Sequence, residues 1–199
     1  MIVNRLVNRY RLKAPVEIID TTLGIPQKYK QECIDEIYKI GDSQNQKTNV
    51  KAIMSSWYLW KESKVFNPLL NKIIDTILTS GKDRQHLVLC DAWSAIYKQN
   101  HHTIAHSHVP SYMSFVYYLQ SSGNTPLVFD NTDFSINPVD DTLIVFPAYL
   151  IHSVPPHNDE KDRICVAGNI EYLESLDKKY LTKRGKTIYP YTFNENNGT

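Results

Sequence analysis

The sequence predicts one mainly β domain with flanking helices, its strands arranged as an antiparallel sandwich or jelly roll. After residue 86, short segments rich in β-branched and aromatic residues follow one another, separated by Pro, Asn, Asp and Gly. No helical pattern comes between them, which argues against a parallel α/β sheet. The predicted strand segments are residues 86–97, 111–120, 125–130, 141–150 and 162–173.

The chain has 199 residues, which fits a single domain, 1–199. We divide it into a helical or mixed N-terminal support region (1–85), a jelly-roll core (86–171) and a C-terminal tail (172–199). The tail contains a strand fragment at most.

Two helices are expected to brace the sheet from outside. The first covers residues 25–42, where apolar residues recur at helical spacing and Gly41 is a suitable stop. The second covers residues 67–81, with Asn67 as its expected cap and a broad apolar stripe. Residues 44–60 read as a loop that leads into a short strand.

Composition excludes several classes of protein. The net charge is +1 and the basic residues are scattered, so binding to nucleic acid is not expected. The N-terminus has no continuous apolar core like that of a signal peptide, and no run approaches the roughly 20 apolar residues of a membrane helix. Cys33, Cys90 and Cys165 are far apart, which favours free thiols in a reducing cytoplasm.

Histidines gather in one short stretch, where residues 101–108 hold four of the chain's seven. His106 and His108 form an H-x-H pair, and two residues on one strand two positions apart share a face. His152 follows a strongly apolar strand, whose end a jelly roll can bring beside the pair. Two close ligands and a distant third are the layout of a facial metal triad with open positions. The other histidines, His86, His101, His102 and His157, are predicted to lie at the surface.

Arg163 comes 11 residues after His152 and begins a predicted strand. If its side chain points into the barrel, a buried guanidinium needs an anionic partner. No acid follows on the same strand face until Glu171, so an anionic ligand held by both arms of the guanidinium would fill that need. The alternative is a surface arginine paired with one of the acids at 159–162.

Taken in order, these residues resemble the pattern of the 2-oxoglutarate/Fe(II)-dependent oxygenases. The resemblance is to the prolyl-hydroxylase-like branch, and within it to a poorly characterised group common in bacteriophage genomes. It covers about residues 86–171 and implies a double-stranded β-helix, the cupin-like jelly roll. The matching residues are Trp93, His106, His108, Pro110, the run 114–119, Phe146, Pro147, His152, Val154, Pro155 and Arg163-Ile164-Cys165.

The resemblance implies a role for each matching residue. His106 and His152 would bind Fe(II), while Arg163 and Tyr118 would hold the distal carboxylate of the co-substrate 2-oxoglutarate. O2 would take the last open position at the metal. The implied activity is a dioxygenase that hydroxylates a C–H bond, and the first expectation for the substrate is a protein or peptide residue such as proline. The implied location is the cytoplasm, or the host cytoplasm if a phage encodes the protein.

Two positions depart from the family pattern. His108 stands where the family has a carboxylate, and we interpret it as a third metal ligand. Water in that position, or a nearby acid such as Asp130, are the alternatives. Cys165 replaces a small hydroxyl residue two positions after Arg163, and a thiol is the weaker hydrogen-bond donor. The loop between His108 and Tyr118 is short, so the family's substrate class does not transfer.

Four more residues are candidates for the surroundings of the site. Trp93 is expected in the core rather than on the pocket wall. Asn169 is either a turn residue or a substrate contact. Asp130 and Asp133 are expected on a rim loop, where solvated acids are common.

Two other functions compete with the oxygenase. A cupin-type metal-binding protein also has H-x-H before a distal histidine, but it needs a Glu a few residues later, where residues 112–114 are Tyr-Met-Ser. A non-enzymatic jelly-roll binding or virion component would have incidental histidines. Arg163 and Tyr118 favour the oxygenase over both.

Overall fold

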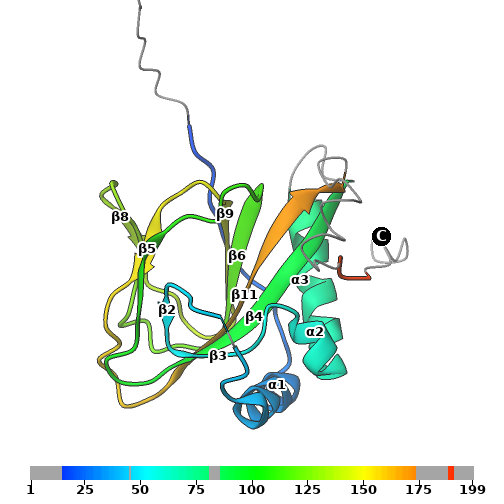
Figure 1. The fold of residues 1–199 in the computed structure, drawn as a ribbon, viewed down its shortest axis with the longest axis vertical. Helices are drawn as coiled ribbons and strands as arrows, with labels where there is room; N and C mark the ends of the chain where they lie inside the picture. The colour runs from blue at the N-terminus through cyan, green and yellow to red at the C-terminus, as the bar shows by residue number, and fades with distance from the viewer. Residues whose placement is uncertain (1–14, 45, 81–85, 174–187, 191–199) are drawn as a thin grey trace, which may run out of the picture.

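Two antiparallel β-sheets face each other in the computed structural model, which describes residues 15–44, 46–80, 86–173 and 188–190 (Figure 1). The larger sheet has the order β1 (Ile19–Thr22), β9 (Thr142–Pro147), β6 (Met113–Gln120), β11 (Arg163–Tyr172), β4 (Leu87–Tyr97) and β3 (Ile53–Met54). The smaller sheet has the order β2 (Val50–Lys51), β5 (His102–His106), β10 (His152–Val154), β7 (Leu127–Phe129) and β8 (Phe134–Ile136).

The chain passes repeatedly between the two sheets. From β4 to β11, the strands β4, β6, β9 and β11 belong to the larger sheet, and β5, β7, β8 and β10 to the smaller one. This alternation of eight antiparallel strands is the double-stranded β-helix, so the predicted fold class is confirmed. The site-bearing strands β5 and β10 are therefore central neighbours, although 46 positions separate His106 from His152.

The N-terminal region contributes strands as well as helices. β1 extends the larger sheet beside β9, β3 extends it beside β4, and β2 pairs with β5 of the smaller sheet. Each has only two to four residues. Such short segments carry too little alternation to stand out in a sequence, and only one of them was expected.

The helices cover the outer face of the larger sheet (Figure 1). α1 (Gln27–Ile40) ends at Gly41, whose φ of 62° lies in the left-handed region, as expected for a helix stop. α3 (Asn67–Thr79) differs from the prediction at its start, because Phe66 holds the cap position and the Asn67 side chain makes no capping bond. Between them lie α2 (Leu59–Glu62) and the 3-10 helix η1 (Lys64–Phe66).

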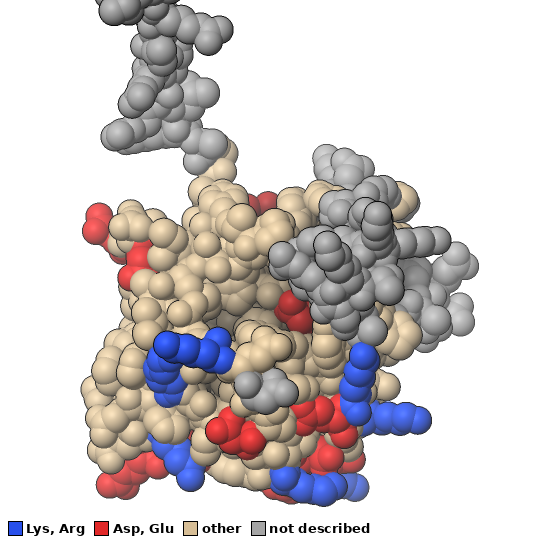
Figure 2. Space-filling model, viewed as in Figure 1, with Lys and Arg blue, Asp and Glu red and all other residues tan. Residues whose placement is uncertain are grey.

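The larger hydrophobic core lies between these helices and the larger sheet, and a smaller cluster lies between the two sheets. Charged side chains of both signs are interspersed on the face seen in Figure 2, without an extended basic patch. No helix in the described part of the chain is long and apolar enough to cross a membrane. All three cysteines are buried, and they form no disulfide bond with one another, as expected. Gly81 and most of the predicted tail lie outside the described residues.

Candidate metal and co-substrate site

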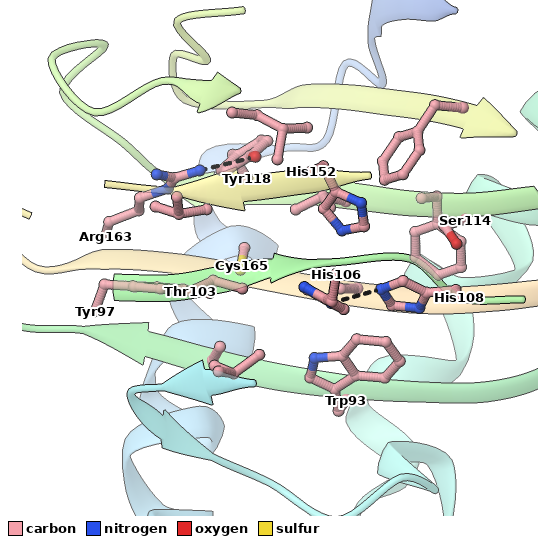
Figure 3. A pocket seen from close by; sticks show the side chains of 18 residues that line it. Trp93, Tyr97, Thr103, His106, His108, Ser114, Tyr118, His152, Arg163 and Cys165 are labelled. Carbon is pink, nitrogen blue, oxygen red and sulfur yellow. Dashed lines mark hydrogen bonds between the residues drawn. The ribbon is translucent and has the colours of Figure 1, made fainter. Parts of the chain in front are cut away.

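The three predicted histidines converge at one end of the sandwich interior. His106 is the last residue of β5, and His152, the first residue of β10, pairs directly with it in the smaller sheet. His108 lies two positions beyond the end of β5, so the turn after the strand, and not the strand itself, brings it to the same side. One ligand atom from each of the three lies within 4.8 Å of the others (Figure 3).

Backbone carbonyls orient two of these rings. Nδ1 of His106 lies 2.8 Å from the carbonyl of Ile104, and Nδ1 of His152 lies 3.0 Å from the carbonyl of Leu150. A ring that donates from Nδ1 has its lone pair on Nε2, which is how metal-binding histidines are commonly fixed. Nε2 of His106 and Nε2 of His108 are 2.9 Å apart. Two nitrogens bound at right angles to one ion at about 2.05 Å would be separated by about the same distance.

Burial keeps the triad uncharged. Desolvation, followed by the neighbouring imidazoles, lowers the pKa of His108 to about 3. Desolvation is also the main reason why the pKa of His152 is lowered to about 4 and that of His106 falls below its usual value. A neutral imidazole is the form that binds a metal, so all three rings are ready to do so near neutral pH.

Trp93 and Asn169 support His108. The Trp93 ring stacks nearly parallel to the His108 ring, with centroids 5.8 Å apart and an interplanar angle of 9°. Trp93 is therefore both a buried core residue and part of the cavity wall. Asn169 is buried inside β11 rather than in a turn; it accepts from the Ser114 hydroxyl at 2.8 Å and donates to Asp91 at 2.7 Å. Its side chain also forms a hydrogen bond with His108, which opposes the lowering of the pKa of that ring.

Arg163 lies at the other end of the interior and is 1% exposed. Its Nη1 donates to the carbonyl of Thr125 at 3.1 Å, and its Nη2 donates to the hydroxyl of Tyr118 at 2.9 Å. Its Nε is buried without a hydrogen-bond partner, and no acidic side chain of the described residues pairs with it. The guanidinium also lies over the rings of Tyr97 and Tyr118. Arg163 is thus not a surface arginine but a buried cation, and the part of the chain that the structure describes supplies no counter-charge to it.

One narrow cavity joins the two ends, with the triad and Arg163 both in its wall (Figure 3). Its sides are mainly apolar and come from both sheets. Cys165 lines it two positions after Arg163, and burial raises the pKa of this thiol to about 11, which keeps it neutral. The five site residues predicted from the sequence, His106, His108, Tyr118, His152 and Arg163, all lie around this cavity.

The sequence interpretation missed His157. It was predicted at the surface but is 1% exposed. Nδ1 of His157 lies 2.9 Å from the hydroxyl of Thr125, and Nε2 lies 2.8 Å from the carbonyl of Lys161. Because the Thr125 carbonyl accepts from Arg163, His157 supports the residue that holds the guanidinium. The prolines before it and the acids after it resemble an exposed loop, and only the contact with Thr125 reveals its role.

Comparison with known proteins identifies the fold. No protein-family model matches the chain, and no curated protein matches its sequence. Among solved structures, the viral collagen prolyl hydroxylase of Paramecium Bursaria Chlorella virus-1, in its 2-oxoglutarate complex, has a TM-score of 0.61 at 16% identity, over 77% of this chain and 94% of that one. A prolyl-4-hydroxylase from Pseudomonas putida has a TM-score of 0.62 at 16% identity, over 78% and 92%.

A third similar structure contains a metal ion together with 2-oxoglutarate. HygX from Streptomyces hygroscopicus, with nickel and 2-oxoglutarate bound, has a TM-score of 0.61 at 12% identity, over 79% of this chain and 83% of that one. At these identities the likeness establishes the architecture, which is the double-stranded β-helix shared by prolyl hydroxylases and other 2-oxoglutarate-dependent oxygenases.

Proposed function

We propose that this protein is an Fe(II)- and 2-oxoglutarate-dependent dioxygenase that hydroxylates a C–H bond of its substrate. One observation carries the proposal: a single cavity has three neutral imidazoles at one end and, at the other, a buried guanidinium that pairs with no acid of the described residues. The solved structures of the same fold that contain 2-oxoglutarate support this choice of acid.

The residues around the cavity fit both Fe(II) and 2-oxoglutarate. His106, His108 and His152 would hold Fe(II) on one face and leave positions for a chelating acid and for O2. Arg163 would bind the distal carboxylate of 2-oxoglutarate, since guanidinium and carboxylate have matching geometry. Tyr118 accepts a hydrogen bond from Arg163, so its own hydroxyl proton remains to be donated to the same carboxylate.

The chain contributes positioning and exclusion of water. When bound, the iron would supply the activation of O2 that the side chains cannot provide. In the overall reaction, O2 gives one oxygen atom to the C–H bond of the substrate and the other to 2-oxoglutarate, which becomes succinate and CO2. Arg163 and Tyr118 fix the far end of the co-substrate, and the apolar cavity walls keep bulk water from the reacting centre.

A spectroscopic titration tests the proposal. Mixing the metal-free protein with Fe(II) and 2-oxoglutarate without oxygen should produce a visible metal-to-ligand charge-transfer band, and admission of O2 should release succinate. His106→Ala should lose both signals. His86→Gln, a change at an exposed histidine, is the matched control and should retain both. Failure of the wild-type protein to form the band would refute the proposal.

A cupin-type metal protein is the second candidate, favoured by the third histidine in place of a carboxylate. It predicts metal binding without the charge-transfer band, since it gives Arg163 no ligand. A binding or virion component predicts neither signal.

For the oxygenase, we retain a peptidyl residue such as proline as the proposed substrate and a reducing cytoplasm as the proposed location. A solved structure of this fold holds a peptide fragment of a hypoxia-inducible factor, which supports the substrate class.

A further inference from the structure

A carboxylate lies beside the histidine triad. Asp130 is the first residue after β7, and β7 pairs with β10 so that Phe129 stands directly opposite His152. The backbone N–H of Asp130 donates to the carbonyl of Ile151 at 2.8 Å. The strand register therefore holds Asp130 next to the start of β10, where His152 is located.

The environment of this carboxylate is unfavourable by itself. Its Oδ2 is buried and has no hydrogen-bond partner in the described part of the chain. A buried oxygen loses its hydrogen bonds to water, and here no group of the described residues replaces them. This destabilises the oxygen when it is charged. Burial also lowers the pKa of His106 and His152, and the Asp130 charge opposes that change in both. The carboxylate therefore acts electrostatically on two of the three rings.

Asp130 is nevertheless not one of the close ligand set. Of the described residues, only His106, His108 and His152 form a group whose ligand atoms lie within 4.8 Å of one another. The Nδ1 atoms of His106 and His152 are already engaged with backbone carbonyls. Asp130 is thus positioned to act through space, neither as a fourth ligand nor as the hydrogen-bond partner of a ring.

The charge of the ligand set explains what such an acid would do. A set of two histidines and one carboxylate neutralises one of the two charges of a divalent ion, whereas three neutral imidazoles neutralise none. We propose that Asp130 supplies, from outside the ligand set, the negative charge that His108 does not bring to the metal centre. The proposal rests on the proposed function only in requiring a divalent ion at the triad.

Metal titration of three proteins tests this role. The wild type, Asp130→Asn and Asp133→Asn are titrated with Co(II) and with Zn(II) in the absence of 2-oxoglutarate. Asp130→Asn should raise the Kd about tenfold, the lower end of the effect of outer partners on metal affinity. Asp133, exposed in the same turn, is the matched control, and its change should alter the Kd less than twofold.

Two further measurements separate charge from structure. The absorption spectrum of the Co(II)-saturated protein should be the same for Asp130→Asn and wild type, because the ligands do not change. The melting temperature of metal-free Asp130→Asn should equal or exceed that of wild type, since a buried unpartnered charge is removed. A structural role would instead lower the melting temperature.

The outcomes are distinct. An unchanged Kd in Asp130→Asn overturns the inference, and so does an altered Co(II) spectrum, which would make Asp130 a ligand. A loss of metal affinity accompanied by a melting temperature several degrees lower also overturns it. If the wild type itself binds no metal, the proposed function fails as well; if it binds normally while the Asp130→Asn Kd is unchanged, this inference alone fails.

Discussion

The two ends of the cavity are built in opposite ways. At one end, Arg163 is fully charged, 1% exposed and bonded only to internal groups. At the other end, the three imidazoles are neutral, and those of His106 and His108 are only half-buried. A sealed, charged end suits one fixed acid, whereas a partly open, neutral end suits a centre that must admit O2 and a second substrate. The contrast indicates that the substrate approaches from the histidine end.

The two ends also belong to different sheets. Arg163 and Tyr118 lie on β11 and β6 of the larger sheet, which the helices brace from outside. His106 and His152 lie on β5 and β10 of the smaller sheet. The cation therefore stands on the more heavily supported layer, and His106 and His152 stand on the layer that no helix of the described residues covers. Each of the following changes alters one end and should leave the other intact.

Arg163→Gln should have the largest effect. Truncating one partner of a buried charge pair costs about 2–5 kcal/mol, so the Kd for 2-oxoglutarate should rise at least about 30-fold, and by more than 1000-fold at the upper limit. The Kd for Co(II) should change less than about threefold, because the triad is untouched. Calorimetric titration with each ligand measures both quantities.

Two outcomes would contradict the contrast between the two ends of the cavity. Near-normal binding of 2-oxoglutarate by Arg163→Gln would show that the buried cation does not hold the acid. Parallel loss of metal binding would show that the two ends are not independent. Arg163→Lys, which keeps the charge but loses the forked geometry, should fall between the wild type and Arg163→Gln.

His108 variants should have the next largest effect, at the metal end. His108→Ala removes one of three nitrogen donors, so the Kd for Co(II) should rise about tenfold or more, equivalent to at least ~1.4 kcal/mol. His108→Asp supplies a carboxylate donor in place of the imidazole, and its Kd should return to within a few-fold of wild type. Metal binding by His108→Ala at the wild-type affinity would show that His108 is not a ligand.

The pH dependence of stability should also separate the ends, because the triad histidines, unlike Arg163, take up protons on unfolding just below neutral pH. Desolvation lowers the pKa of His152 to about 4 and that of His108 to about 3 in the folded protein. Unfolded histidines take up protons as the pH falls through about 6.5, while these two do not. The unfolded state therefore binds more protons between about pH 6.5 and 4, and metal-free stability should fall as the pH falls through this window.

Each such histidine contributes a slope of up to ~1.4 kcal/mol per pH unit. Urea unfolding of the metal-free protein at pH 7, 6 and 5, with a chelator present, measures the slope. The slope of the unfolding free energy against pH should be smaller for His152→Gln than for wild type, by the equivalent of about one proton. Carboxylates that titrate in the same range cancel in this difference, and equal slopes would contradict the prediction.

Features that depend on local composition and on the order of residues could be predicted from the sequence. The β-branched and aromatic residues of β4, β6 and β11 predict strands, and the H-x-H pair with a distal histidine predicts the triad, which the fold then brings together. For Arg163, the same-face argument predicts the need for an anionic ligand only if the side chain is buried, and the structure shows that it is. These properties depend on periodicity and order, which a sequence shows directly.

Features that depend on contacts between residues far apart in the sequence could not be predicted from it. Asn169 looks like a strand-end turn residue, but its partners Ser114 and Asp91 are 55 and 78 positions away. His157 looks exposed because its neighbours are polar, yet Thr125 and Lys161 enclose its ring. No local pattern encodes such pairs, because strand register and loop packing create them.

His157 offers the smallest and most selective test of the comparison, because its ring contacts Thr125, whose carbonyl accepts a hydrogen bond from Arg163. His157→Gln retains one amide in place of two ring nitrogens, so Thr125 loses a fixed partner and its carbonyl is held less firmly toward Arg163. A lost neutral hydrogen bond is worth about 1 kcal/mol. We therefore expect the Kd for 2-oxoglutarate to rise about fivefold and the melting temperature to fall by about 2–4 °C.

Thr125→Val, which removes the hydroxyl but keeps the carbonyl, should reproduce the Kd change, and the Kd for Co(II) should not move in either variant. A Kd for 2-oxoglutarate equal to wild type at the lowered melting temperature would make His157 a general structural residue, with no part in positioning the guanidinium.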